Sequence, residues 1–322
     1  MLYYSAALLA GFLILFKSAD QFVIGAVATA KNLSISPMVI GLTVVALGTS
    51  APEIFVSVTS SLQGEPGLAV GNAIGSNIAN IGLVLGFTAL IVPLRFRVDI
   101  LRNDLPILVF VTLCAGAALI DLHLGLWDGL LLLTGLALFV FRLAVEQKRA
   151  SNFVIAAEIS ELEEMPHMST ARALVTFLLS LVFLLLSAEL LVWAVVNIAA
   201  SLGVSELVIG LTVIAVGTSL PELVVSVTSA LKHQADLAVG NIVGSNILNI
   251  LAVLSIPGLI YPTHYADSTL WRDYAMMLAL TAALVVFAYG FRSNTKVSRL
   301  EGAILLTAWV GYMFYLYHVA TG

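Results

Sequence analysis

Two glutamates occupy matching positions in a duplicated, strongly apolar stretch of the chain. Glu53 lies in residues 40–81 and Glu222 in residues 209–250, and about two thirds of the aligned positions are identical without a gap. A carboxylate inside a membrane span costs on the order of 2.5–3.5 kcal/mol or more, so such a group usually serves a function. Two carboxylates in a low dielectric cannot both stay charged unless cations or protons neutralise them. We therefore predict that Glu53 and Glu222 jointly bind a cation.

The residues just before each glutamate add further hard oxygen ligands. The motifs read GTSAPE and GTSLPE, and their prolines are Pro52 and Pro221. Because proline has no amide hydrogen, we expect carbonyls one turn earlier, near Ala46 and Ala215, to lose their helical partners. Carboxylate, carbonyl and hydroxyl oxygens suit Ca²⁺ or Na⁺ better than soft metals. A proline kink beside a protonated glutamate is the plainer alternative. The hydroxyl groups beside the break belong to Thr49, Ser50, Thr218 and Ser219.

A second motif follows in each copy and reads GNAIGSNIAN at 71–80 and GNIVGSNILN at 240–249. Its glycines are spaced as in GxxxG, which lets helix backbones approach closely. Its polar residues are four apart and so share one helix face. Ca²⁺ takes ~6–8 oxygen ligands, and we predict that four of these polar side chains complete that shell: Ser76, Asn80, Ser245 and Asn249.

Two more acids lie in apolar sequence, Asp20 and Glu189, with Lys17 one turn from Asp20. Asp20 precedes Glu53 by the same number of residues as Glu189 precedes Glu222. A structural anchor bonded to the repeated core is one interpretation, and a gate on the ion path is the other.

The composition defines the class of protein. Of the 322 residues, 60% are hydrophobic and 10% are charged, whereas soluble proteins carry roughly 25% charged residues. The chain is therefore predicted to be a polytopic membrane protein. Its net charge of −5 gives no sign of nucleic-acid binding, and its one cysteine, Cys114, excludes an intrachain disulfide. The apolar N-terminus has no basic region or cleavage site and is expected to be a retained helix.

About ten stretches are long and apolar enough to cross a bilayer, which takes ~20 residues. If the N-terminus is extracytoplasmic, the loop lysines and arginines fall on the cytoplasmic side except Arg272, as the positive-inside rule requires. Both termini are then expected to be extracytoplasmic. The predicted spans are about 2–29, 37–62, 68–93, 103–120, 126–145, 170–200, 206–231, 236–260, 271–291 and 298–318.

The spacing of the duplication predicts two inverted five-helix repeats. Matching residues lie 169 positions apart, since 222 − 53 = 169 and 189 − 20 = 169, and the two glutamate spans are an odd number of crossings apart. We predict an N-terminal repeat at 1–150, a cytoplasmic acidic linker at 151–169 and an inverted C-terminal repeat at 170–322. Inverted repeats are typical of secondary transporters whose substrate site lies near the bilayer midplane.

The doubled GTSxPE and GSNxxN motifs resemble the two alpha repeats of the cation/Ca²⁺ exchanger superfamily, of the Na⁺/Ca²⁺ exchanger type. The resemblance covers essentially the whole chain, which looks most like the small homologues of the bacterial inner membrane. It implies that the first and sixth spans slide across the other eight. It also implies Glu53 and Glu222 as the central Ca²⁺ ligands. Some relatives carry Asp where this chain has Asn249. The further Ca²⁺ and Na⁺ ligands implied are the carbonyls of Ala46 and Ala215 and the side chains of Thr49, Thr218, Ser50, Ser219, Ser76, Ser245 and Asn80.

The function expected from these observations is a secondary antiporter that exchanges Ca²⁺ for Na⁺ by alternating access at the two-glutamate site. Its partners are these ions and the lipid bilayer, without a cofactor, and an oligomer is not required. A H⁺/Ca²⁺ antiporter and a K⁺-dependent Na⁺/Ca²⁺ exchanger stay open, as does Mn²⁺ as cargo. An intramembrane aspartyl protease needs Asp in a catalytic setting, which the motifs lack, and the inverted duplication disfavours a channel. We therefore do not expect an enzyme.

Overall fold

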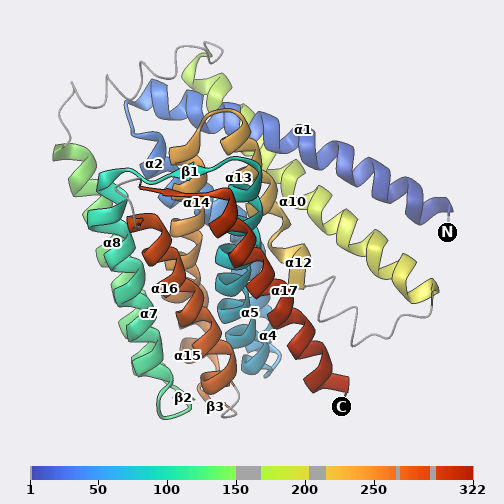
Figure 1. Cartoon of the computed structure of the whole chain (residues 1–322), viewed down its shortest axis with the longest axis vertical. Coiled ribbons are helices and arrows are strands. Elements are labelled where there is room, and N and C mark those ends of the chain that lie inside the picture. Colours follow the sequence, from blue (N-terminus) through green and yellow to red (C-terminus); the bar gives the residue numbers. More distant parts are fainter. Residues whose placement is uncertain (1, 150–167, 203–214, 266–268, 291–294, 322) are drawn as a thin grey trace.

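The computed structural model describes residues 2–149, 168–202, 215–265, 269–290 and 295–321, and these are almost entirely helical (Figure 1). Eight of the described helices are long and apolar enough to cross a membrane. A further span is formed by Pro37–Thr49 and Ala51–Leu62, which meet at a bend of 45°. The seventh expected span, 206–231, starts outside the described residues and contributes the helix Leu220–Leu231. The predicted all-α polytopic architecture is thus confirmed.

The N-terminal half consists of apolar helices interrupted by π-helical segments, which are labelled η. Four of its helices contain a proline in their first turn, where the missing amide hydrogen costs nothing. Its elements are α1 (Leu2–Leu33), α2 (Pro37–Ile40), η1 (Gly41–Val45), α3 (Ala46–Thr49), α4 (Ala51–Leu62), α5 (Pro66–Ala79), η2 (Asn80–Leu85), α6 (Gly86–Ile91), β1 (Leu94–Arg95), η3 (Ile100–Asp104), α7 (Leu105–Leu119), β2 (His123–Leu124) and α8 (Leu126–Arg149).

The C-terminal half repeats this order of elements. Its described elements are α10 (Thr170–Ser201), α12 (Ala215–Thr218), α13 (Leu220–Leu231), α14 (Ala235–Leu248), η5 (Asn249–Val253), α15 (Ser255–Ile260), β3 (Thr263–His264), η6 (Thr269–Tyr274), α16 (Ala275–Tyr289), β4 (Lys296–Val297) and α17 (Arg299–Thr321).

Element boundaries reproduce the offset of 169 found in the sequence. Helix α4 begins at 51 and α13 at 220, and α5 begins at 66 and α14 at 235. The short antiparallel ladders follow the same rule, since β1 begins at 94 and β3 at 263. Strand β1 pairs with β4, and β2 pairs with β3. The two ladders lie at opposite ends of the bundle (Figure 1), as equivalent elements of inverted repeats must.

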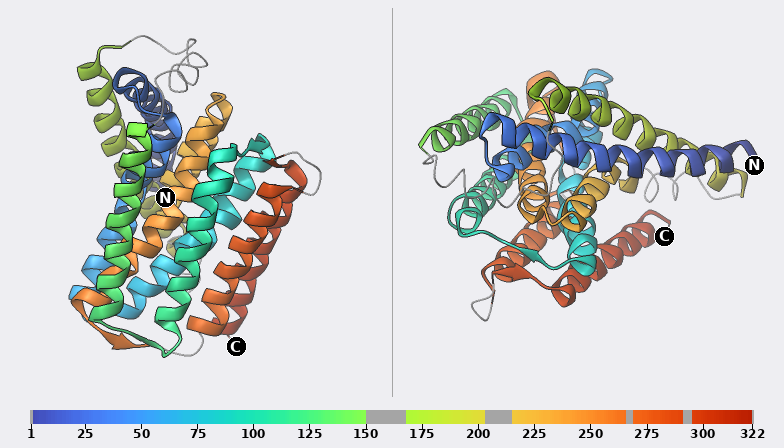
Figure 2. Two further views of the ribbon diagram at one scale, coloured as in Figure 1. Left: turned by 90° about the vertical axis from the view of Figure 1, so that its left-hand side faces the viewer. Right: turned by 90° about the horizontal axis from the view of Figure 1, so that it is seen from above.

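Helices α1 and α10 form a layer of their own. They lie side by side and run obliquely across the remaining helices (Figures 1 and 2). The ring of Phe22 stacks on that of Phe177 with centroids 4.6 Å apart. A Cβ at Gly25 would lie 2.7 Å from the backbone nitrogen of Phe177, so only glycine permits this approach. The pair packs on the bundle through a separate apolar cluster that includes Ile40, Val45 and Val225.

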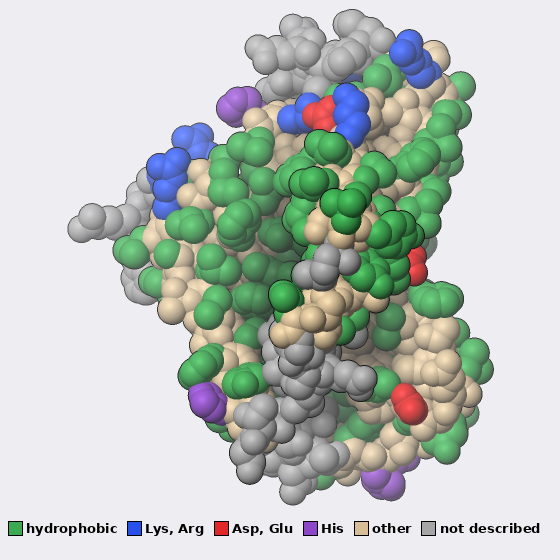
Figure 3. Space-filling model, turned by 90° about the vertical axis from the view of Figure 1, so that its right-hand side faces the viewer, with side chains coloured by type: hydrophobic (Ala, Val, Ile, Leu, Met, Phe, Trp, Pro, Cys, Tyr) green, Lys and Arg blue, Asp and Glu red, His purple; other side chains and the backbone are tan. Residues whose placement is uncertain are grey.

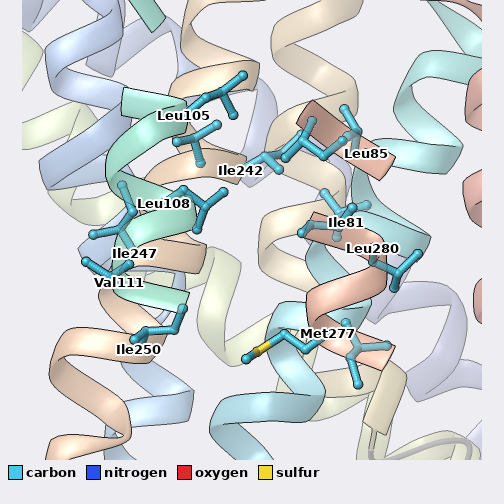
Figure 4. Close-up of a cluster of buried hydrophobic side chains, with 14 of the residues drawn as sticks. Ile81, Leu85, Leu105, Leu108, Val111, Ile242, Ile247, Ile250, Met277 and Leu280 are labelled. Carbon is cyan, nitrogen blue, oxygen red and sulfur yellow. The ribbon is translucent and has the colours of Figure 1, made fainter. Parts of the chain in front are cut away.

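The main core fills the space between the remaining helices. Leu105, Leu108 and Val111 of α7 face side chains of α14 and η5, among them Ile247 and Ile250 (Figure 4). This packing positions α14, which carries one copy of the second polar motif, in the centre of the bundle.

The surface separates an apolar band from a basic end. Hydrophobic side chains cover most of the described surface in Figure 3, and the lysine and arginine side chains lie towards its upper part. Ion pairs between Arg97 and Asp236 and between Arg142 and Asp104 lie at the β1 end of the bundle. This distribution is the one that the loop charges predict.

Candidate cation-binding site

A helix break places each glutamate at the centre of the molecule. Ser50 has φ −84° and ψ 9°, and Ser219 has φ −88° and ψ 3°, so both copies leave helical geometry at the same position. The next helix starts at once, with Pro52 or Pro221 in its first turn. Glu53 and Glu222 therefore lie in the first turns of α4 and α13, and each is only 1% exposed. Positive backbone charge at a helix start favours a carboxylate there.

The two glutamate motifs meet each other across the bundle. The Ser50 hydroxyl donates a hydrogen bond of 3.1 Å to Oε1 of Glu222. The side chain of Thr49 also lies beside Glu222. The Ser76 side chain hydrogen-bonds to Glu53, and the two carboxylates interact electrostatically with each other. The acids from the two halves thus share one site.

Several polar atoms of this site are buried without a hydrogen-bond partner in the described part of the chain. Burying an unpaired oxygen is costly, so such atoms mark a place where a ligand completes the bonding. Carboxylate, hydroxyl and amide oxygens are the ligands that Ca²⁺ and Na⁺ prefer, and the set therefore fits a hard cation. The atoms concerned include Oε2 of Glu53 and of Glu222, the amide atoms of Asn80 and Asn249, and the hydroxyls of Ser219 and Ser245.

The carbonyl of Ala46 differs from the expectation. It accepts a hydrogen bond of 2.9 Å from the Ser50 amide and one of 3.3 Å from the Thr49 hydroxyl. The break at Ser50 therefore does not free this oxygen, because the last turn of α3 still closes on it. In the second copy the Ser219 amide bonds to Val216 instead of Ala215. Thr218 is half-buried beside this turn.

Two asparagines that sequence reasoning missed brace the site. Asn241 accepts a hydrogen bond from Thr49 and donates one to Ser226, both 3.1 Å long. Asn72, its equivalent, donates to the backbone carbonyl of Glu53 at 3.1 Å. Both belong to the GN pairs that open the second motif. Their place in a repeated polar motif was the signal that could have found them.

The second motifs change helix type at the predicted ligands. The π-helical segment η2 starts at Asn80, and η5 starts at Asn249. π-Helical turns are frequent at functional sites. The change widens the helix where each asparagine side chain enters the centre, and nothing in the local sequence predicts it.

Asp20 and Glu189 lie away from the glutamate pair. The carboxylate of Asp20 forms a 2.6 Å ion pair with the ammonium of Lys232, which follows α13. Glu189 is exposed on α10. Asp20 thus contacts the residue that follows α13, in keeping with an anchor.

Fold and site together define a secondary transporter for hard cations, built from two related halves around paired carboxylates. The family described as sodium/calcium exchanger protein matches residues 3–145 and 172–318. The chain belongs to this family, and it is a cation/Ca²⁺ exchanger of the membrane and not an enzyme.

Individual relatives are similar to this chain over nearly their whole lengths. The chain is 44% identical over 317 residues to the putative antiporter CaxA of Alkalimonas amylolytica, covering 98% of this chain and 99% of the relative. It is 36% identical over 321 residues to the inner membrane protein YrbG of Escherichia coli strain K12, covering 98% of each. A solved structure of the sodium-calcium exchanger NCX_Mj, soaked with zero Na⁺ and Ca²⁺, superposes with a TM-score of 0.82 at 33% identity, covering 98% of this chain and 99% of that one.

Proposed function

We propose that this exchanger moves Ca²⁺ in one direction and Na⁺ in the other at the site between Glu53 and Glu222. The observation that carries the proposal is the burial of both carboxylates in one site, each with an oxygen that has no hydrogen-bond partner in the described chain. One Ca²⁺ neutralises two carboxylates, and Na⁺ ions compete for the same oxygens. The relative NCX_Mj is named a sodium-calcium exchanger, which supports this choice of ions.

The proposed ligands come from both halves. Glu53, Thr49, Ser50, Ser76, Asn80 and the Ala46 carbonyl act from the first half, and Glu222, Thr218, Ser219, Ser245, Asn249 and the Ala215 carbonyl act from the second. Where Ser50 and Ser76 donate to carboxylates, an arriving cation takes the carboxylate oxygen and the hydroxyl turns its own oxygen to the ion. Asn72 and Asn241 hold this geometry from outside.

Electrostatics makes the transport an exchange. An unloaded site would carry two adjacent carboxylates through a closed state in a low dielectric, which is costly. A loaded site is neutral or nearly so and can change the side to which it opens. The protein therefore releases one cation only when another replaces it. Residues 1–150 and 170–322 form the two inverted halves of this proposal, joined by the linker at 151–169, with both termini outside the cytoplasm and the chain in a bacterial inner membrane.

Flux measurements test the coupling ion. Proteoliposomes containing the full chain are loaded with ⁴⁵Ca²⁺, and gradients of Na⁺, K⁺ and pH are imposed one at a time. We expect Ca²⁺ movement with the Na⁺ gradient and none without a counter-cation. Movement driven by the pH gradient alone would instead assign a H⁺/Ca²⁺ antiporter. A requirement for K⁺ beside Na⁺ would assign the K⁺-dependent type.

Asn249 offers a test of stoichiometry. Asn249→Asp adds a third carboxylate to the centre, so we expect an altered number of counter-ions per Ca²⁺ with Ca²⁺ binding retained. The reversal potential of Ca²⁺ flux at fixed Na⁺ gradients measures this number. Asn246→Asp is the control, because Asn246 donates to the carbonyl of Ile242 in its own helix. An unchanged reversal potential in Asn249→Asp would place this residue outside the ion shell.

A further inference from the structure

A hollow opens on the surface between α1 and α10, away from the glutamate site. Its volume is about 530 Å³, within the ~300–1,000 Å³ usual for sites that hold small organic molecules. Its walls include Leu13, Ile14, Leu179 and Phe183, which are between 39% and 74% exposed. Because both helices are membrane spans, this apolar hollow faces lipid.

One charged side chain, that of Lys17, lies among the apolar and uncharged polar residues that line this hollow. The nearest acid on its own helix is Asp20, one turn further on. That carboxylate already binds Lys232 at 2.6 Å and accepts a bond from Gln21. No ion pair of Lys17 occurs within the described part of the chain. A basic group in a membrane span needs an anion beside it or must reach the interface.

The second half of the chain does not repeat Lys17. Its equivalent, 169 positions further on, is Leu186. Asp20 has the acidic equivalent Glu189, so the neighbouring position kept its chemistry while position 17 did not. We therefore look for a role of the Lys17 charge that is specific to the first half of the chain.

We propose that this hollow, called here the α1–α10 groove, binds an anionic phospholipid. An acyl chain lies against Leu13, Ile14, Leu179 and Phe183, and the headgroup phosphate binds the ammonium of Lys17. Basic pockets between membrane helices bind anionic headgroups in this way. The amide of Gln21 and the hydroxyl of Thr176, which also line the groove, supply polar contacts next to the phosphate. The binding is separate from ion exchange and does not depend on which counter-ion is used.

Lipid retention tests the proposal directly. The full chain is extracted from vesicles that contain equal amounts of palmitoyl-oleoyl phosphatidylglycerol and phosphatidylcholine, and native mass spectrometry counts the lipids that remain bound. We expect wild-type protein to retain phosphatidylglycerol about five-fold in preference, the effect of ~1 kcal/mol for one basic residue at an anionic lipid. Lys17→Gln should remove the preference, and Lys17→Arg should keep it. Inorganic phosphate at millimolar concentration should not displace the lipid.

Two further variants separate the groove from surface charge in general. Lys296→Gln removes a lysine on β4, away from the groove, and should leave retention unchanged. Leu179→Trp fills the groove while leaving Lys17 in place, and should reduce retention as much as Lys17→Gln does. The proposal is overturned if Lys17→Gln behaves as wild type, if Lys296→Gln loses as much lipid, or if Leu179→Trp retains it. Displacement by inorganic phosphate would show an anion site without an acyl chain and would overturn it as well.

Discussion

Helices α5 and α14 carry the same motif, yet they lie in different surroundings. Leu237 near the start of α14 is fully buried, whereas its equivalent Leu68 in α5 is 59% exposed. A Cβ at Gly244 would come within 2.6 Å of the Leu42 carbonyl oxygen, but a Cβ at Gly75 would meet no described atom within 4 Å. Helix α14 is thus covered by α2 and η1, whereas the described residues leave the corresponding part of α5 open.

The difference teaches how one site can serve two sides. Residues 37–42 close over α14, and their equivalents, residues 206–211, lie outside the described part of the chain. Because the halves are inverted, α5 and α14 start from opposite ends of the bundle. Under the alternating access that we propose, interchanging the two environments would move the opening from one side of the membrane to the other. That interchange requires the two copies to stay similar in sequence, because each copy must fit both environments.

The largest effect on transport is expected at Glu53 and Glu222, because both copies must supply a carboxylate to the shared site. Glu53→Gln and Glu222→Gln each remove one of the two charges that neutralise Ca²⁺, so each should reduce ⁴⁵Ca²⁺ exchange to background in proteoliposomes. Glu53→Asp and Glu222→Asp keep the charge and serve as controls that should retain measurable exchange. Should one Gln variant transport Ca²⁺ at the wild-type rate, the shared site would be wrong.

The second prediction compares the stability of variants in the enclosed helix α14 and the more open helix α5. Adding a methyl group where backbone must move costs ~1–3 kcal/mol, whereas replacing helical Gly by Ala in open space gains up to ~1 kcal/mol. Gly244→Ala should therefore lower the unfolding temperature in detergent, and Gly75→Ala should leave it equal or slightly higher. Fluorescence-detected thermal unfolding of both variants measures the difference. Equal destabilisation by the two would show that the open surroundings of α5 are not those of the protein in solution.

Much of this arrangement could be predicted from the sequence, for physical reasons that particular residues show. The apolar runs predict the spans, since a helix satisfies all of its backbone hydrogen bonds internally in lipid. The offset of 169 across an odd number of crossings predicts the inversion. The pairing of Pro52 with Glu53 predicts a break that carries a carboxylate. These features depend on the residue types themselves and on their spacing.

The remaining features depend on local backbone geometry or on contacts between distant segments. The π-helical turns at Asn80 and Asn249 and the bonded carbonyl of Ala46 come from local backbone geometry that residue types do not fix. The roles of Asn72 and Asn241 needed the partner helix to be in place. The unequal surroundings of α5 and α14 could not be predicted at all, because the two motifs are nearly the same.

A third and smaller effect is expected at the two bracing asparagines. Asn241 is fully buried and joins Thr49 to Ser226, while Asn72 is half-buried with one bond to a backbone carbonyl. Leaving buried partners unsatisfied costs ~1–3 kcal/mol, so Asn241→Ala should lower the unfolding temperature more than Asn72→Ala does. Both should weaken Ca²⁺ binding, which isothermal titration in detergent measures. A larger drop in unfolding temperature for Asn72→Ala than for Asn241→Ala would contradict the conclusion that α14 is the more enclosed of the two helices.

The smallest effect is expected at the acids of α1 and α10. Asp20 pairs with Lys232, whose side chains are 36% and 26% exposed, and pairs with this exposure contribute ~0–1 kcal/mol. The equivalents of these residues are Glu189 and Gln63, which cannot form an ion pair. Asp20→Asn should therefore lower the unfolding temperature slightly at low salt and less at high salt, because salt screens exposed charges. Glu189→Gln should leave the unfolding temperature unchanged at low and at high salt. The double variant Asp20→Asn, Lys232→Gln isolates the pair, since it should lose less stability than the sum of the two single changes. Strict additivity, or an equal response of Glu189→Gln, would show that the contact between α1 and the end of α13 does not distinguish the two halves.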